Sequence, residues 1–375
     1  SAPIRLFFII LSQFLSGSIW FAANVAYLGQ GLLLSAVQFG FILGTLTFAF
    51  FNISDRFSPA RVFFLSALFG ALFNFSGIFL GDHKPFLLIS RILCGMSLAG
   101  IYPVGMKIAA SWYPETLSKA LGWLVGALIL AAGFPYLINA FSWQNDTFFI
   151  LQATSLLCFA GGLIQLFLVG DGPHLPKSSK FDVGVIKTIF QHPGFRAASF
   201  GYFGHMWELY AVYAYIPLVF KTIVKNNADL WSFSFFVSGF AGCAVGGMIA
   251  LRVGSRIVAL AALFISGTIC LISPFLSNLP QGLALIILLI WGMAVVADSP
   301  QFSSLNTQFA PRAYVGSALT IVNCIGFLIT IITIELLGLW INWFGIRTAF
   351  LPLVIGPIFG WISLKKYSGK PRETI

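Results

Sequence analysis

About twelve long apolar stretches fill this chain of 375 residues, and the second half of them repeats the first. The clearest repeat joins three positions to partners that follow 197 positions later: Gly95 to Gly292, Pro103 to Pro300 and Pro114 to Pro311. One helical unit used twice explains these equal intervals. A chain that crosses a bilayer many times in two parallel halves has the plan of a secondary transporter.

The composition indicates whether these stretches fold in water or in lipid. Only 9% of the residues are charged and 58% are hydrophobic, whereas soluble domains carry about 25% charged residues. A helix crosses the hydrocarbon layer with about 20 apolar residues. Lipid offers no partner to backbone amides, and no alternating pattern of a barrel is visible. We therefore expect an all-α membrane protein with twelve transmembrane helices in two pseudo-symmetric six-helix bundles.

The apolar runs and the polar stretch between them divide the chain. We expect an N-terminal bundle over 1–170, a cytoplasmic linker over 171–196 and a C-terminal bundle over 197–375. Within the linker, Val183 to Gln191 is either a short amphipathic helix on the inner leaflet or a plain connector. We place the twelve spans at 6–28, 36–52, 62–80, 86–110, 118–140, 147–169, 197–220, 231–250, 256–276, 282–308, 313–337 and 347–364.

The charged residues indicate the orientation. Sixteen Lys and Arg residues lie on one side of the predicted spans and four on the other, which places both termini in the cytoplasm of a bacterial inner-membrane protein. The net charge of +10 therefore reflects topology and does not indicate nucleic acid as a partner. No signal peptide is visible. Five isolated cysteines inside apolar runs predict no metal site and no disulfide framework, and we expect no cofactor.

Four ionisable side chains stand out because each lies inside a predicted span, at a cost of about 2.5–3.5 kcal/mol. Glu208 lies near mid-membrane, where poor solvation disfavours the charged form. His205 lies one turn earlier on the same helix face, and imidazole exchanges a proton near neutral pH. We expect this pair to couple transport to protons. The alternatives are a hydrogen-bonded tie between helices and substrate contact alone.

The other two are Asp298 and Arg91. Asp298 precedes Pro300, which frees a backbone carbonyl, so the carboxylate either joins the proton-coupling site or caps a kinked turn. Arg91 presents a planar cationic fork that can bind a substrate carboxylate, or it forms a structural salt bridge or carbonyl clamp. Aromatic and amide side chains, each of which could also be packing, are expected to line the same binding cavity: Trp20, Asn24, Tyr102, Trp207, Tyr210 and Asn323.

The loop between the second and third predicted spans resembles a signature of the major facilitator superfamily, Gly-x-x-x-Asp-Arg-x-Gly-Arg-Arg. Asp55, Arg56 and Arg61 match it, whereas both glycines are replaced. Arg91 and Gly95 fit the Arg-x-x-x-Gly pattern of the family's fourth span. The resemblance implies the major facilitator fold and a rocker-switch mechanism. It also implies that this loop is a conformational latch on the cytoplasmic side.

The segment from Gly204 to Tyr210 resembles a subgroup of bacterial carriers grouped with cyanate and other small-anion permeases. We interpret the chain as a proton-coupled secondary transporter for a small organic anion or zwitterion. Its expected partners are the substrate, protons and lipid, and a monomer suffices. No nucleotide loop, metal cluster or nucleophile–base motif indicates an enzyme. The alternative is a proton-antiport efflux pump in which Glu208 and Asp298 bind an amphipathic cation.

Overall fold

The structure is a computed structural model that describes residues 2–27, 31–81, 83–115, 117–141, 146–175, 181–311 and 314–367. These residues form helices and contain no strand. Ten helical stretches among them are long and apolar enough to cross a membrane. The pair α1 (Ala2–Gly17) and α2 (Ala22–Ala26), and the long helix α11 (Pro193–Ile223), lie at the two remaining predicted spans. The all-α membrane fold predicted from the sequence is therefore confirmed.

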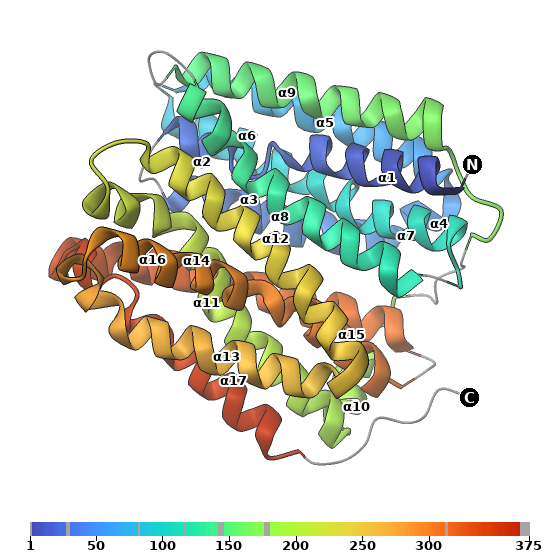
Figure 1. Ribbon diagram of the computed structural model, residues 1–375. Helices are drawn as coiled ribbons and strands as arrows, with labels where there is room; N and C mark the ends of the chain where they lie inside the picture. The colour runs from blue at the N-terminus through green and yellow to red at the C-terminus, as the bar shows by residue number, and fades with distance from the viewer. Residues whose placement is uncertain are drawn as a thin grey trace. The chain divides into compact units, whose positions relative to one another are not determined.

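The chain divides into two compact units, Ser1–Ser178 and Ser179–Ile375. In unit 1, α3 packs against α6, and α5 packs against α6 and α9 (Figure 1). A Cβ atom on Gly95 would lie 2.0 Å from the carbonyl oxygen of Val37, so only glycine permits this approach of α3 to α6. After α1 and α2 the elements of unit 1 are α3 (Gly31–Phe51), α4 (Ile53–Arg56), α5 (Pro59–Leu80), α6 (Lys84–Ala99), α7 (Tyr102–Trp112), α8 (Leu117–Phe141), α9 (Thr147–Ile164) and the π-helical turn η1 (Gln165–Val169).

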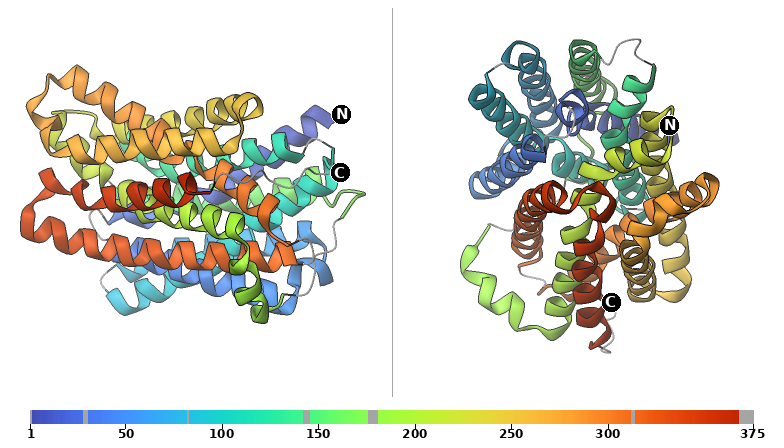
Figure 2. Two further views of the ribbon diagram at one scale, coloured as in Figure 1. Left: turned by 90° about the horizontal axis from the view of Figure 1, so that it is seen from below. Right: turned by 90° about the vertical axis from the view of Figure 1, so that its left-hand side faces the viewer.

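In unit 2, α11 packs against α16 and α17. Glycines again permit the closest approach, because a Cβ atom on Gly204 would lie 2.4 Å from the carbonyl oxygen of Gly356. The long helix α16 is orange-red in Figure 2. Besides α11 the elements of unit 2 are η2 (Val183–Val185), α10 (Ile186–Gln191), α12 (Ala228–Val253), α13 (Ser255–Ile272), η3 (Ser273–Asn278), α14 (Gln281–Ala297), α15 (Ser299–Phe309), α16 (Val315–Phe344), η5 (Ile346–Thr348), η6 (Leu351–Val354) and α17 (Ile355–Lys365).

Three spans that the sequence analysis treats as continuous are broken. The span predicted at 86–110 consists of α6 and α7, and the one at 282–308 consists of α14 and α15. Pro103 and Pro300 lie in the first turns of α7 and α15, where the amide hydrogen that proline lacks would have no helical partner. The first span breaks between α1 and α2. The repeated prolines therefore mark equivalent breaks in the two units.

The predicted linker is tied to the unit nearest each of its ends. The Oδ1 atom of Asp171 accepts a hydrogen bond of 2.8 Å from the backbone nitrogen of Ala60, at the start of α5. The backbone nitrogen of Asp182 donates one of 3.1 Å to the hydroxyl of Ser317 in α16. The helix considered for Val183 to Gln191 is present as η2 and α10. Linker residues 176–180 lie outside the described ranges.

Candidate functional site

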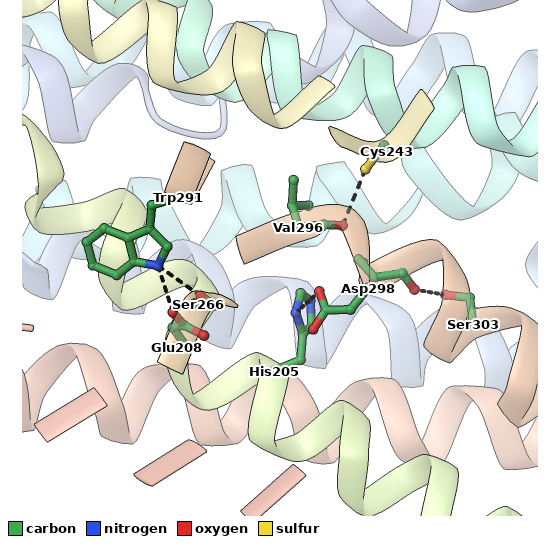
Figure 3. A network of polar contacts seen from close by, with 9 residues as sticks. His205, Glu208, Cys243, Ser266, Trp291, Val296, Asp298 and Ser303 are labelled. Carbon is green, nitrogen blue, oxygen red and sulfur yellow. Dashed lines mark hydrogen bonds and ion pairs between the residues drawn. The ribbon is translucent and has the colours of Figure 1, made fainter. Parts of the chain in front are cut away.

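Glu208 is the centre of a buried hydrogen-bond network in unit 2. The side chain is 1% exposed, and its Oε1 atom accepts bonds from the indole Nε1 of Trp291 at 3.0 Å and the thiol of Cys270 at 3.4 Å. The hydroxyl of Ser266 donates to the same oxygen, and it also accepts from the Trp291 indole at 2.8 Å. Figure 3 shows Trp291 and Ser266 at the Glu208 carboxyl. Helices α11, α13 and α14 therefore share one carboxyl group.

A second polar contact lies one turn earlier on α11. The Nδ1 atom of His205 is 2.8 Å from the Oδ1 atom of Asp298, and both side chains are almost fully buried. Asp298 occupies the break between α14 and α15, and its side chain makes no capping hydrogen bond to α15. The carboxylate instead faces the imidazole (Figure 3). The geometry therefore favours the polar-site interpretation of Asp298 over the capping one.

The three residues proposed for proton coupling lie close together, but they form two neighbouring networks. Glu208 bonds to groups of α13 and α14, whereas His205 faces Asp298. Among the described contacts there is no direct hydrogen bond between His205 and Glu208. Asp298 does interact electrostatically with Glu208. Asp298 is therefore the described group that interacts with both networks.

Arg91 lies in unit 1 and is fully buried. Its guanidinium donates to Oδ1 of Asn74 at 2.9 Å and to the backbone oxygen of Phe73 at 2.9 Å. Further bonds go to the backbone oxygen of Asn74 and to the hydroxyl of Ser90. These contacts correspond to the carbonyl clamp that the sequence left open as an alternative to anion binding. A substrate carboxylate would have to displace them.

The six expected lining residues are divided between the units, so their convergence on one cavity stays a prediction. In unit 1, the Nδ2 atom of Asn24 donates to the hydroxyl of Tyr136 at 3.1 Å, and the ring of Trp20 lies 5.1 Å from that of Phe41. In unit 2, the ring of Tyr210 lies 5.5 Å from that of Phe327. The six differ in exposure: Trp20, Asn24 and Tyr210 are buried, Tyr102 and Trp207 are half-buried, and Asn323 is exposed.

The predicted latch loop contains one ion pair that the sequence analysis missed. Asp55, in α4, pairs with Lys107 of α7, and the Nζ atom of Lys107 also donates to the backbone oxygen of Ser54 at 2.7 Å. Arg56 and Arg61, the other two expected members, are exposed. The sequence feature that could have indicated this pair is Lys107, which lies near the predicted inner end of the fourth span, on the same side as Asp55 in the loop.

The donors to Glu208 were also missed. Ser266 and Cys270 are four residues apart on α13, a spacing that places both on one helix face. Trp291 immediately precedes Gly292, a member of the repeat. These patterns could have identified the face of each helix, although the sequence does not say that the two faces meet α11.

Comparisons with known proteins place this geometry in context. The sequence matches the family model described as Major Facilitator Superfamily over residues 5–334. No curated protein matches it. Among solved structures, the chain is similar to a variant of the E. coli fucose:proton symporter FucP, with a TM-score of 0.66 and 17% sequence identity. The similarity covers 99% of this chain and 100% of that chain. At this identity the likeness concerns the fold.

Proposed function

Because the chain belongs to the Major Facilitator Superfamily, a family of transporters, we propose that it is a proton-coupled secondary transporter. The proposed cargo is a small organic anion or zwitterion, which crosses the membrane by alternating access. The similar fold of FucP, described as a fucose:proton symporter, supports proton symport as the coupling mode. We place the protein in a bacterial inner membrane, as a monomer with both termini in the cytoplasm.

The observation that carries the proposal is the buried cluster of His205, Glu208 and Asp298 in unit 2. Ionisable groups inside a membrane span are costly, and they commonly mark ion or proton pathways. An ionised Glu208 accepts charge-assisted hydrogen bonds from Ser266 and Trp291, and such bonds are roughly twice as strong as neutral ones. Protonation of the carboxyl weakens them and loosens α11 from α13 and α14. Proton binding can thereby bias a conformational equilibrium.

Substrate recognition is proposed to involve the aromatic and amide side chains expected from the sequence. The latch loop around Asp55 is proposed to close the cytoplasmic side in the outward-open state. The position of Arg91 gives specific support to the second candidate, a proton-antiport efflux pump for amphipathic cations. Its guanidinium is already bound by Asn74 and Phe73, whereas the carboxyls of Glu208 and Asp298 remain as groups that could bind a cation.

The direction of proton movement separates the two candidates. Purified protein is reconstituted into liposomes that contain a pH-sensitive dye, and each compound is added outside without a preset pH gradient. Inward symport of a small carboxylate acidifies the lumen. Inward movement of a hydrophobic cation such as tetraphenylphosphonium in exchange for protons makes the lumen alkaline. Acidification of the lumen by a carboxylate supports anion–proton symport. If the cation makes the lumen alkaline and no carboxylate acidifies it, cation–proton antiport replaces that proposal.

A further inference from the structure

One ring nitrogen of His205 lies against the carboxylate of Asp298, and the other has no hydrogen-bond partner among the described residues. Its Nδ1 atom faces Asp298 at 2.8 Å. Its Nε2 atom is fully buried, and no hydrogen-bond partner for it occurs in the described part of the chain. A buried polar atom left unpaired retains the full cost of its desolvation. A molecule that binds the Nε2 atom would remove that cost.

Aromatic rings enclose this imidazole. The ring of Tyr202 lies 6.0 Å from it and the ring of Phe302 lies 6.1 Å from it, measured between centroids. Glycines leave the space that both rings occupy. A Cβ atom on Gly326 would lie 2.6 Å from the Tyr202 ring, and one on Gly201 would lie 2.4 Å from the Phe302 ring. His205 is 1% exposed, so a hydrogen bond formed there is little weakened by water.

We propose that the Nε2 atom of His205 binds the anionic group of the substrate, a carboxylate, when the imidazole carries a proton. With Nδ1 directed to Asp298, a neutral imidazole offers only a lone pair at Nε2, which repels a carboxylate. A protonated imidazole offers an N–H group at the same point, which donates a charge-assisted hydrogen bond. One imidazole then requires a proton before it accepts an anion. This inference rests on the proposed symport and assigns its anion site to unit 2 instead of Arg91.

The charged and titratable groups around His205 are compatible with this role. Asp298 is the facing acid, from the break between α14 and α15, and it interacts electrostatically with Glu208 of α11, Cys243 of α12 and Tyr213 of α11. Tyr202 lies on α11 itself. The faces of α16 and α17 that meet α11 here present glycines. An ionised Glu208 repels an anion at His205, and a protonated Glu208 does not. Protonation of either residue therefore favours anion binding at His205.

Two substitutions separate the ring nitrogens. His205→Asn places an amide near the position of Nδ1 and retains contact with Asp298, but it has nothing at the Nε2 position. His205→Gln places an amide near Nε2 that donates at every pH. The probes are formate, acetate, lactate, pyruvate, succinate and citrate, and binding to the purified full chain is followed by thermal shift at mildly acidic and mildly alkaline pH.

We expect the wild type to bind at least one carboxylate about tenfold more tightly at acidic pH, a difference of about 1.4 kcal/mol. His205→Gln should bind that carboxylate with a smaller difference between the two pH values than the wild type, the remainder coming from Glu208, and His205→Asn should lose binding at both. A measurement on the wild type avoids dependence on variant folding. In ¹⁵N-histidine NMR, the carboxylate should shift the Nε2 resonance of His205 more than its Nδ1 resonance.

Wild-type affinity in a folded His205→Asn variant overturns the inference, and so does an unshifted Nε2 resonance. Failure of every carboxylate to bind the wild type does the same. The proposed function fails by a different result, namely uptake by the wild type that a proton gradient does not drive. Gradient-driven uptake that His205→Asn leaves unchanged removes the inference alone.

Discussion

The indole Nε1 of Trp291 lies 3.0 Å from the Oε1 atom of Glu208, and neither side chain is more than 1% exposed. The position 197 residues earlier in the repeat holds Cys94, whose thiol donates to the backbone oxygen of Gly70 at 3.7 Å. The same helix position thus supports an ionisable group in unit 2 and only helix packing in unit 1. The proposed proton-coupling site is therefore assigned to the second half of the repeat.

Replacement of Trp291 by phenylalanine tests the value of this hydrogen bond. Trp291→Phe retains the ring contacts with Phe235 and Phe350 but leaves Glu208 with one donor fewer, so we expect destabilisation by about 1–3 kcal/mol. The free energy of unfolding is measured in denaturant. Trp207→Phe is the control, because the indole nitrogen of Trp207 has no hydrogen-bond partner among the described residues. Equal losses in the two variants would show that the bond to Glu208 contributes nothing.

Removal of the Arg91 guanidinium should primarily weaken unit 1. Arg91→Ala breaks the bonds to Asn74, Phe73 and Ser90, and we expect a loss of at least about 2 kcal/mol in the free energy of unfolding. The exposed Arg61→Ala serves as control and should change it little. Carboxylate binding by the folded fraction should persist. A variant of wild-type stability that no longer binds carboxylates would instead restore Arg91 as the anion site.

The close approach of α3 to α6 depends on the absence of a Cβ atom at Gly95. Gly95→Ala would place Cβ 2.0 Å from the Val37 carbonyl oxygen, and such overpacking typically costs about 1–3 kcal/mol. Among the described residues, Gly122→Ala in α8 brings the new Cβ within 4 Å of no heavy atom apart from its chain neighbours and its own helix backbone. It should be neutral or stabilising by up to about 1 kcal/mol, because alanine favours helix. Melting temperatures compare the two, and a Gly95→Ala variant as stable as Gly122→Ala would contradict the packing described.

The ion pair of Asp55 and Lys107 is predicted to be the contact through which the latch loop affects transport. Asp55→Asn and Lys107→Met should each slow uptake into liposomes severalfold, and the double variant should be no slower than either. Such non-additivity is the sign of one shared interaction. Lys84→Met, at the exposed start of α6, should leave the rate unchanged. Additive effects of the two substitutions would mean that the residues act separately.

The sequence predicted some features of the site well because they depend on local chemistry. Pro300 indicated a disturbed helix beside Asp298, since proline removes a backbone hydrogen bond, although the equivalent break at Pro103 was not expected. The rarity of acids in membrane spans identified Glu208 and Asp298. Both kinds of signal are independent of which helices are neighbours.

The features that the sequence could not predict depend on tertiary packing. The clamp on Arg91 is built by Asn74 of α5, a different helix, and the donors to Glu208 come from α13 and α14. Periodicity identifies the faces of a helix, but it does not identify the neighbour that each face meets. For the same reason the pairing of Lys107 with Asp55 was not expected.

The most direct test of the account is the proton-driven accumulation of a transported carboxylate by liposomes that contain the Glu208→Gln variant. Glu335→Gln makes the same chemical change at an exposed position of α16 and is the matched control. The account predicts that Glu208→Gln loses accumulation against a gradient but still exchanges substrate across the membrane, whereas Glu335→Gln behaves like the wild type. Proton-driven accumulation by Glu208→Gln at the wild-type rate would contradict the account.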